Sequence, residues 1–191
     1  SMRYADIDEN PVRPQEGNAT ITFYRDDLNL DDKALTSVPV LLEKKNFEFE
    51  PVGILNAGYK VRMELPPGKY SFFTGLKNPT RLNAELAADK HYYVRLETTV
   101  KMTRFGEDFL SNPSFDLIPM VWGDQDKDVV RRIKSCIPVK MNDEARQWVE
   151  THAQELQTRL MNSYRVYSEG GAFGLKPIPR IKPEDGVDNL L

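Results

Sequence analysis

The chain has 191 residues, of which 40% are hydrophobic, and a formal net charge of −3. This length and apolar content suit one substantial domain. Lysine and arginine are scattered along the sequence, so we do not expect the basic surface that binding to nucleic acid needs. No run approaches the roughly 20 apolar residues that span a bilayer. The single cysteine, Cys136, excludes an intrachain disulfide.

The first 17 residues are polar and contain Pro11, Pro14 and Gly17, which predicts an irregular lead-in. A domain over residues 18–140 follows. Short apolar or alternating segments predict strands at 20–24, 38–42, 47–49, 52–55, 59–65, 70–74, 82–86, 91–96, 98–105 and 115–122. Pro51 withholds a hydrogen-bond donor, which indicates an edge strand or a bend. This spacing is typical of a sandwich or a barrel, and we predict a mainly β fold, an antiparallel β-sandwich of about eight strands.

A proline-glycine corner, Leu65-Pro66-Pro67-Gly68, joins two of the expected strands. The apolar residues alternate with charged ones before the corner, and aromatic residues continue the pattern after it. We therefore expect one core to contain Tyr59, Val61, Met63, Leu65, Tyr70 and Phe72.

The last third of the chain changes to a helical period. Residues 126–134 predict a short helix with its charges placed to suit the helix dipole. Asn142 is a plausible N-cap for a longer helix, within residues 141–168, that carries an apolar stripe. The stripe comprises Ala145, Trp148, Val149, His152, Leu156 and Leu160. We expect it to pack on the strand domain, because a lone helix of this length is marginal in water.

Residues 169–191 contain several glycines and prolines, which predicts an extended tail. Its spaced apolar residues favour docking on a surface, either that of its own domain or that of a partner. A mobile terminus is the alternative interpretation of the same composition.

Two acidic groups are candidates for a cation site. Asp124, Asp126 and Asp128 match the start of an EF-hand calcium loop, but the required glycine and the bidentate glutamate are replaced. The second group comprises Asp26, Asp27, Asp31 and Asp32. Such carboxylates on a loop are usually solvated, so we expect no metal and no cofactor.

The histidines, His91 and His152, lack the spacing of a zinc site and favour structural roles. A Cys136-His152 nucleophile pair is conceivable, but Cys136 lies in a segment that predicts a buried strand, where a thiol is inert. The sequence also contains neither a nucleophile elbow nor a phosphate-binding glycine loop. We therefore predict no catalytic residues and no enzymatic activity.

Aromatic residues offer another kind of site. Tyr92 and Tyr93 are expected on opposite faces of one strand, so at least one of them could lie outside the core. Several exposed rings together would make a platform for sugars. Core packing is the alternative for most of these rings.

Several motifs together resemble a family of uncharacterised domains, that is domains of unknown function, in bacterial lipoproteins and other envelope proteins. The resemblance covers about residues 19–139. It rests on Ile21-Thr22-Phe23-Tyr24-Arg25, Leu65-Pro66-Pro67-Gly68-Lys69-Tyr70, Asp89-Lys90-His91-Tyr92-Tyr93-Val94-Arg95, residues 115–118 and Ile133-Lys134-Ser135-Cys136. It implies a small β-sandwich outside the cytoplasmic membrane, tethered by lipid on an N-terminal cysteine that this sequence does not contain. The family has no established catalytic residues.

Three functional hypotheses follow. The first is a non-enzymatic envelope protein that binds a protein or the cell wall through sheet edges, loops or the tail, because an exposed strand edge can pair with another strand. The second is a carbohydrate- or small-ligand-binding module, and the third is an enzyme. A periplasmic or surface location follows from the resemblance alone, and the sequence does not fix the oligomeric state.

Overall fold

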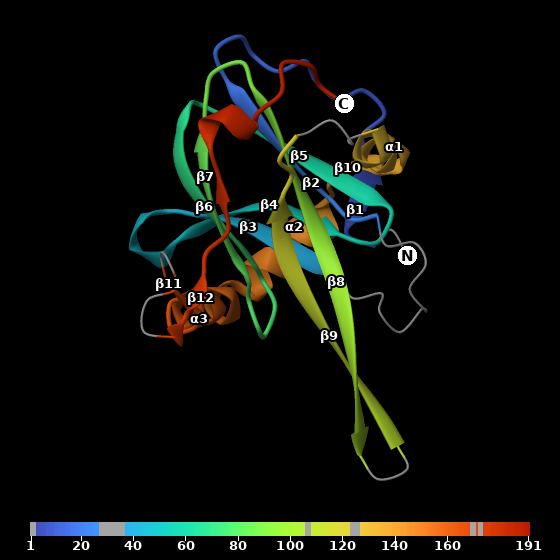
Figure 1. Ribbon diagram of the computed structural model, residues 1–191, viewed down its shortest axis with the longest axis vertical. Helices are drawn as coiled ribbons and strands as arrows, with labels where there is room; N and C mark the ends of the chain where they lie inside the picture. Colours follow the sequence, from blue (N-terminus) through green and yellow to red (C-terminus); the bar gives the residue numbers. More distant parts are fainter. Residues whose placement is uncertain (1–2, 27–36, 106–107, 123–126, 169–170, 172–173) are drawn as a thin grey trace.

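The computed structural model describes residues 3–26, 37–105, 108–122, 127–168, 171 and 174–191, with the backbone alone for residues 100–105 and 108–113. The fold is mainly β, as the sequence predicted (Figure 1). The strands are β1 (Ala5–Ile7), β2 (Ala19–Tyr24), β3 (Val38–Glu43), β4 (Phe49–Leu55), β5 (Tyr59–Leu65), β6 (Gly68–Thr74), β7 (Arg81–Leu86), β8 (His91–Phe105), β9 (Asp108–Pro119), β10 (Ile137–Met141), β11 (Tyr167–Ser168), β12 (Lys176–Pro177) and β13 (Arg180–Ile181). The helices are α1 (Lys127–Ser135), α2 (Asp143–Thr151) and α3 (Ala153–Ser163), with 3-10 turns η2 (Lys45–Phe47) and η4 (Pro183–Asp185).

Two main sheets share one apolar core. One sheet has the order β1-β10-β5-β2-β8-β9, and the other has the order β13-β7-β6-β3-β4. Buried residues of both sheets form a single cluster, among them Phe23, Val40 and Val94. The predicted core around the proline-glycine corner is confirmed. Val61, Leu65 and Phe72 are buried in this cluster, and Tyr59, Met63 and Tyr70 pack against it.

Strand direction differs from the predicted antiparallel arrangement of about eight strands. In the main sheets β2 pairs parallel with β8, β10 with β5, and β13 with β7. Alternation within a strand does not reveal the direction of its neighbour, and parallel neighbours need a long connection. Here the whole segment from β3 to β7 separates β2 from β8. The segment predicted as an irregular lead-in also contributes β1, which pairs with β10.

Helices α2 and α3 cover part of the outer face of the five-stranded sheet. Asn142 caps α2, as predicted, and its side chain accepts a hydrogen bond from the Ala145 N–H at 3.0 Å. The apolar stripe packs on the sheet as predicted: Val149, Leu156 and Leu160 form a buried cluster with Leu41 and Phe73, and Trp148 is partly buried against it. The predicted single helix is interrupted at His152, where the backbone leaves the helical region (φ −101°, ψ 12°).

The outer face of the six-stranded sheet is covered by α1 and by the end of the chain. Tyr24, Tyr93, Ile133 and Cys136 form the buried cluster there, and Val187 and Leu191 pack against it. The tail therefore docks on its own domain. β13 pairs with β7, Val187 bridges His91, and the Leu191 N–H donates to the Tyr93 hydroxyl at 2.7 Å.

Strands β8 and β9 continue beyond the two sheets as a two-stranded ribbon, the β8–β9 ribbon, over residues 100–105 and 108–113. β2 pairs with β8 only as far as Arg95, whereas β9 pairs with β8 to Phe105. Figure 1 shows this ribbon leaving the body of the molecule. The final strand was predicted at 115–122 but begins at Asp108 and passes through Pro113. No helix in the described part of the chain is long and apolar enough to cross a membrane.

Candidate binding site

The structure separates the two residues that were considered for nucleophilic catalysis. Cys136 lies between α1 and β10, rather than inside a strand, and is 3% exposed. Its thiol donates to the Arg132 carbonyl at 3.3 Å. His152 lies at the α2–α3 break, where its ring stacks on Trp148 with centroids 4.3 Å apart. Cys136 and His152 thus belong to opposite outer faces of the two-sheet body, and they do not form a nucleophile-base pair.

The second histidine begins β8, as predicted. His91 Nδ1 lies 2.7 Å from the Thr20 hydroxyl. Burial, followed by the nearby Arg62 guanidinium, lowers the pKa of His91 below its ordinary value. These contacts give His91 a structural environment at the junction of β2, β8 and the tail.

Tyr92 and Tyr93 lie on opposite faces of β8, as predicted, but each is only 1% exposed. Tyr92 lies in the inner core and Tyr93 in the cluster beneath α1 and the chain end. Tyr93 does lie outside the inner core, but it is not exposed as a sugar platform would require, because α1 and the docked tail cover the outer face. These two tyrosines therefore offer no platform for sugars.

Two residues of the predicted acidic groups, Asp26 and Asp128, lie in the described part of the chain, and both pair with arginines. Asp26 accepts from Arg95 at 2.8 Å and from Arg132 at 3.3 Å. Asp128 pairs with Arg131 at 3.0 Å. The other residues of the two predicted acidic groups, Asp27, Asp31, Asp32, Asp124 and Asp126, lie outside the described residues. Within the described ranges, no group of three or more His, Cys, Asp and Glu side chains is arranged to hold a metal ion.

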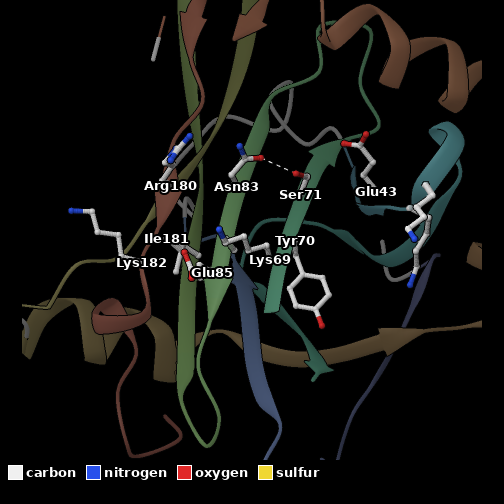
Figure 2. Close-up of a pocket in the computed structure, with 12 residues that line it drawn as sticks. Glu43, Lys69, Tyr70, Ser71, Asn83, Glu85, Arg180, Ile181 and Lys182 are labelled. Carbon is white, nitrogen blue, oxygen red and sulfur yellow. Dashed lines mark hydrogen bonds between the residues drawn. The ribbon is translucent and has the colours of Figure 1, made fainter. Parts of the chain in front are cut away.

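A polar groove of about 600 Å³ lies on the outer face of the five-stranded sheet (Figure 2). Its floor comes from β6 and β7, where Ser71 lies opposite Asn83 and donates a hydrogen bond to its side-chain oxygen at 2.8 Å. The next outward pair along the same strands is Lys69 and Glu85. These side chains face outward because their neighbours, among them Phe72, fill the core.

Two further segments complete the groove. β13 lies beside β7 and brings Arg180 and Lys182 to one side. The end of β3 and the start of η2 bring Glu43, Lys44 and Lys45 to the other side. The groove therefore gathers five basic and two acidic side chains, although the chain as a whole carries a net negative charge.

Two of these charges are neutralised by neighbours. Lys44 pairs with Glu50 at 2.8 Å, and Glu43 pairs with Arg81 at 2.6 Å. Lys45, Lys69 and Lys182 are exposed, and among the described residues no carboxylate forms an ion pair with their ammonium groups. The groove thus presents unneutralised positive charge to solvent.

The wall at Glu43 is fixed by a buried polar network. The Arg81 side chain is only 3% exposed; it bonds Glu43 and the Ser163 hydroxyl, the latter at 2.8 Å. Its guanidinium also lies 4.1 Å from the centroid of the Tyr164 ring, and the Tyr164 hydroxyl donates to Glu43. Burial first, and then the bond to Glu43, raise the pKa of Tyr164. The network joins α3 to the sheet and holds the Glu43 carboxylate in place.

The outer edge of β9 is a second accessible feature. The Met120 N–H bonds the Tyr93 carbonyl at 2.9 Å, so even-numbered positions of β9 face β8 and odd-numbered positions face outward. Pro113 and Pro119 therefore stand where an outward N–H would otherwise be. Prolines at such positions are tolerated on an edge strand and interrupt pairing with a further strand.

The sequence alone did not predict the groove, because its residues come from segments far apart in the chain. Alternation within residues 82–86 indicates that Glu85 faces outward. Arg180 and Lys182 could not be added, because β13 lies far along the chain from β7 and its pairing is a tertiary event. No family model matches the chain, and neither a curated protein nor a solved structure matches it.

Proposed function

We propose that this chain is a non-enzymatic binding module of the bacterial cell envelope, and that it contacts a protein partner through the β8–β9 ribbon. In this proposal the two packed sheets form a β-sandwich scaffold. The observation that carries the proposal is the ribbon itself, which extends beyond the sheets over the pairs from Val100 with Pro113 to Phe105 with Asp108.

The ribbon is a long element for one that only two strands form. Six residues per strand span about 20 Å at 3.4 Å per residue. A two-stranded ribbon is marginally stable in water, because neither face is covered by a third layer. Covering the ribbon with a partner surface would add the third layer that an isolated two-stranded ribbon lacks.

The envelope location rests on the family resemblance in residues 19–139, and a lipid on an upstream cysteine would tether the module. The tail is a poor candidate for the contact with a partner. Its last segment, residues 180–191, already pairs with the chain's own strands or packs on them. Among the described elements, the β8–β9 ribbon extends furthest beyond the sheets, and we propose that it reaches the partner through its side chains, since Pro113 and Pro119 interrupt strand pairing along the β9 edge.

Site-specific photo-crosslinking tests the proposal. Ser114 is exposed in the middle of β9, at the base of the ribbon, so a photoreactive amino acid there should form a discrete adduct with one envelope protein in intact bacteria. The matched control is the same amino acid at Glu150, which is exposed on α2. Absence of an adduct at position 114, or the same adduct from both positions, would contradict a contact through the ribbon.

A further inference from the structure

We infer that the groove on the outer face of the five-stranded sheet binds an acidic polysaccharide, that is a glycan whose sugars carry carboxylate groups. The groove belongs to the sheet that does not contain β8 and β9, so this inference is independent of the ribbon.

Charge is the first argument. Lys45, Lys69 and Lys182 come from three separate elements and converge on one groove without carboxylate partners in the described structure. Like charges brought together repel one another, and a ligand with several negative charges relieves that repulsion. The chain as a whole carries a net charge of −3, so this groove is a local concentration of positive charge that would attract an anionic chain.

The acceptors in the groove favour a sugar over a phosphate polymer. Glu85 is exposed between Lys69 and β13, and the Ser71 hydroxyl retains acceptor capacity after it donates to Asn83. Sugar hydroxyls can donate to both groups. An ionised polyphosphate offers acceptors only, and it would place its negative charge against Glu85.

Rigidity is the third argument. The floor consists of paired strands, and the Glu43 wall is held by the buried Arg81. Little ordering of the backbone is therefore needed when a ligand binds, so the entropic cost is confined to the lysine side chains. The groove lies on the outer face of the sheet (Figure 2), so a long glycan could lie along it and would not need to enter an enclosed cavity.

Isothermal titration calorimetry with defined probes tests the inference. Oligogalacturonate is the carboxylated glycan, polyphosphate of equal charge is the phosphate polymer, and maltohexaose is the neutral glycan. We expect oligogalacturonate to bind most tightly and its affinity to fall with added salt, because salt screens exposed charges.

The double variant Lys69→Gln, Lys182→Gln should weaken oligogalacturonate binding by about tenfold, the equivalent of 1.4 kcal/mol. The matched control is Lys127→Gln, Lys134→Gln, which removes two exposed lysines of α1 and changes the net charge equally. This control should bind as the unmodified chain does, and both variants should keep its thermal midpoint.

Three results would overturn the inference: no binding of oligogalacturonate, tighter binding of polyphosphate, or equal weakening by the two double variants. A chain in which a two-residue turn replaces residues 100–113 of the ribbon should bind the glycan as the full chain does. Failure of this inference is therefore distinguishable from failure of the ribbon proposal.

Discussion

At the scale of single residues, one buried ion pair within the sheet also connects the sheet to the end of α3. Arg81 and Glu43 are 3% and 12% exposed, and they meet at 2.6 Å beneath Tyr164. Removing one partner of a buried pair leaves the other charge without compensation, which costs far more than the loss of a solvent-exposed pair.

Glu43→Gln should therefore lower the free energy of unfolding by about 3 kcal/mol. The change preserves shape but leaves the Arg81 guanidinium without a counter-charge. Urea denaturation measures the effect. Glu50→Gln removes the exposed partner of Lys44 and should change stability by less than about 0.5 kcal/mol. Equal effects of the two substitutions would show that the Arg81 pair has no special weight.

Buried tyrosines predict the behaviour of the fold in alkali. Burial is the main cause that raises the pKa of Tyr24 and of Tyr93 above the ordinary value of 10.0. The folded state thus holds these phenolic protons more tightly than the unfolded chain does, and the resulting stabilisation is complete below pH 10. It is lost as the pH rises above 10 through the higher folded-state pKa values.

Urea midpoints measured from pH 8 to pH 11 should accordingly fall above pH 10. Tyr24→Phe removes one of the titrating groups, so its midpoint should fall less steeply over the same range, whatever its stability at pH 8. A variant curve parallel to that of the unmodified chain would refute this assignment.

At the scale of elements, the packing of α3 on the sheet depends on a missing side chain. A Cβ at Gly75 would lie 2.7 Å from Leu156 Cδ2 and 3.0 Å from Pro39 Cβ. The glycine thus lets the helix approach the end of β6 closely. Leu156 itself is fully buried in the cluster with Leu41 and Phe73.

Gly75→Ala should destabilise the chain by about 1–3 kcal/mol through overpacking, and Leu156→Ala by about 2–5 kcal/mol through a cavity. The double variant should lose less than the sum, because the new methyl group enters the space that Leu156 leaves. Leu160→Ala, in the same buried cluster, should combine with Gly75→Ala nearly additively. Urea denaturation of the single and double variants measures the coupling of Gly75 with each leucine. Equal coupling with Leu156 and Leu160 would contradict a close contact between Gly75 and Leu156.

Elements were predictable where their signal is local. The Asn142 cap, the apolar stripe of α2 and α3, and the core on both sides of Pro66 all follow from spacing within one segment. Parallel pairing of β2 with β8 and the position of β13 beside β7 depend on segments far apart in the chain, and alternation carries no information on either. The groove was missed for the same reason, since its cations come from β6, η2 and the tail. The burial of both Tyr92 and Tyr93 likewise depends on where the tail docks.

At the scale of the whole molecule, the parts that stabilise the fold differ from the part that we propose contacts a partner. The shared core, the two helix-covered faces and the docked tail hold the body together. The ribbon beyond Thr99 and Ser114 pairs only within itself in the described structure. Folding should therefore not need this ribbon, whereas binding of the partner should.

Urea unfolding of a ribbon-shortened chain tests that claim most directly. Residues 100–113 are replaced by Asn-Gly, a two-residue turn that suits hairpins, between the register partners Thr99 and Ser114. We predict a free energy of unfolding within about 0.5 kcal/mol of that of the full chain. A loss of about 2 kcal/mol or more would show that the fold depends on the ribbon, and it would contradict a role for the ribbon in contact alone.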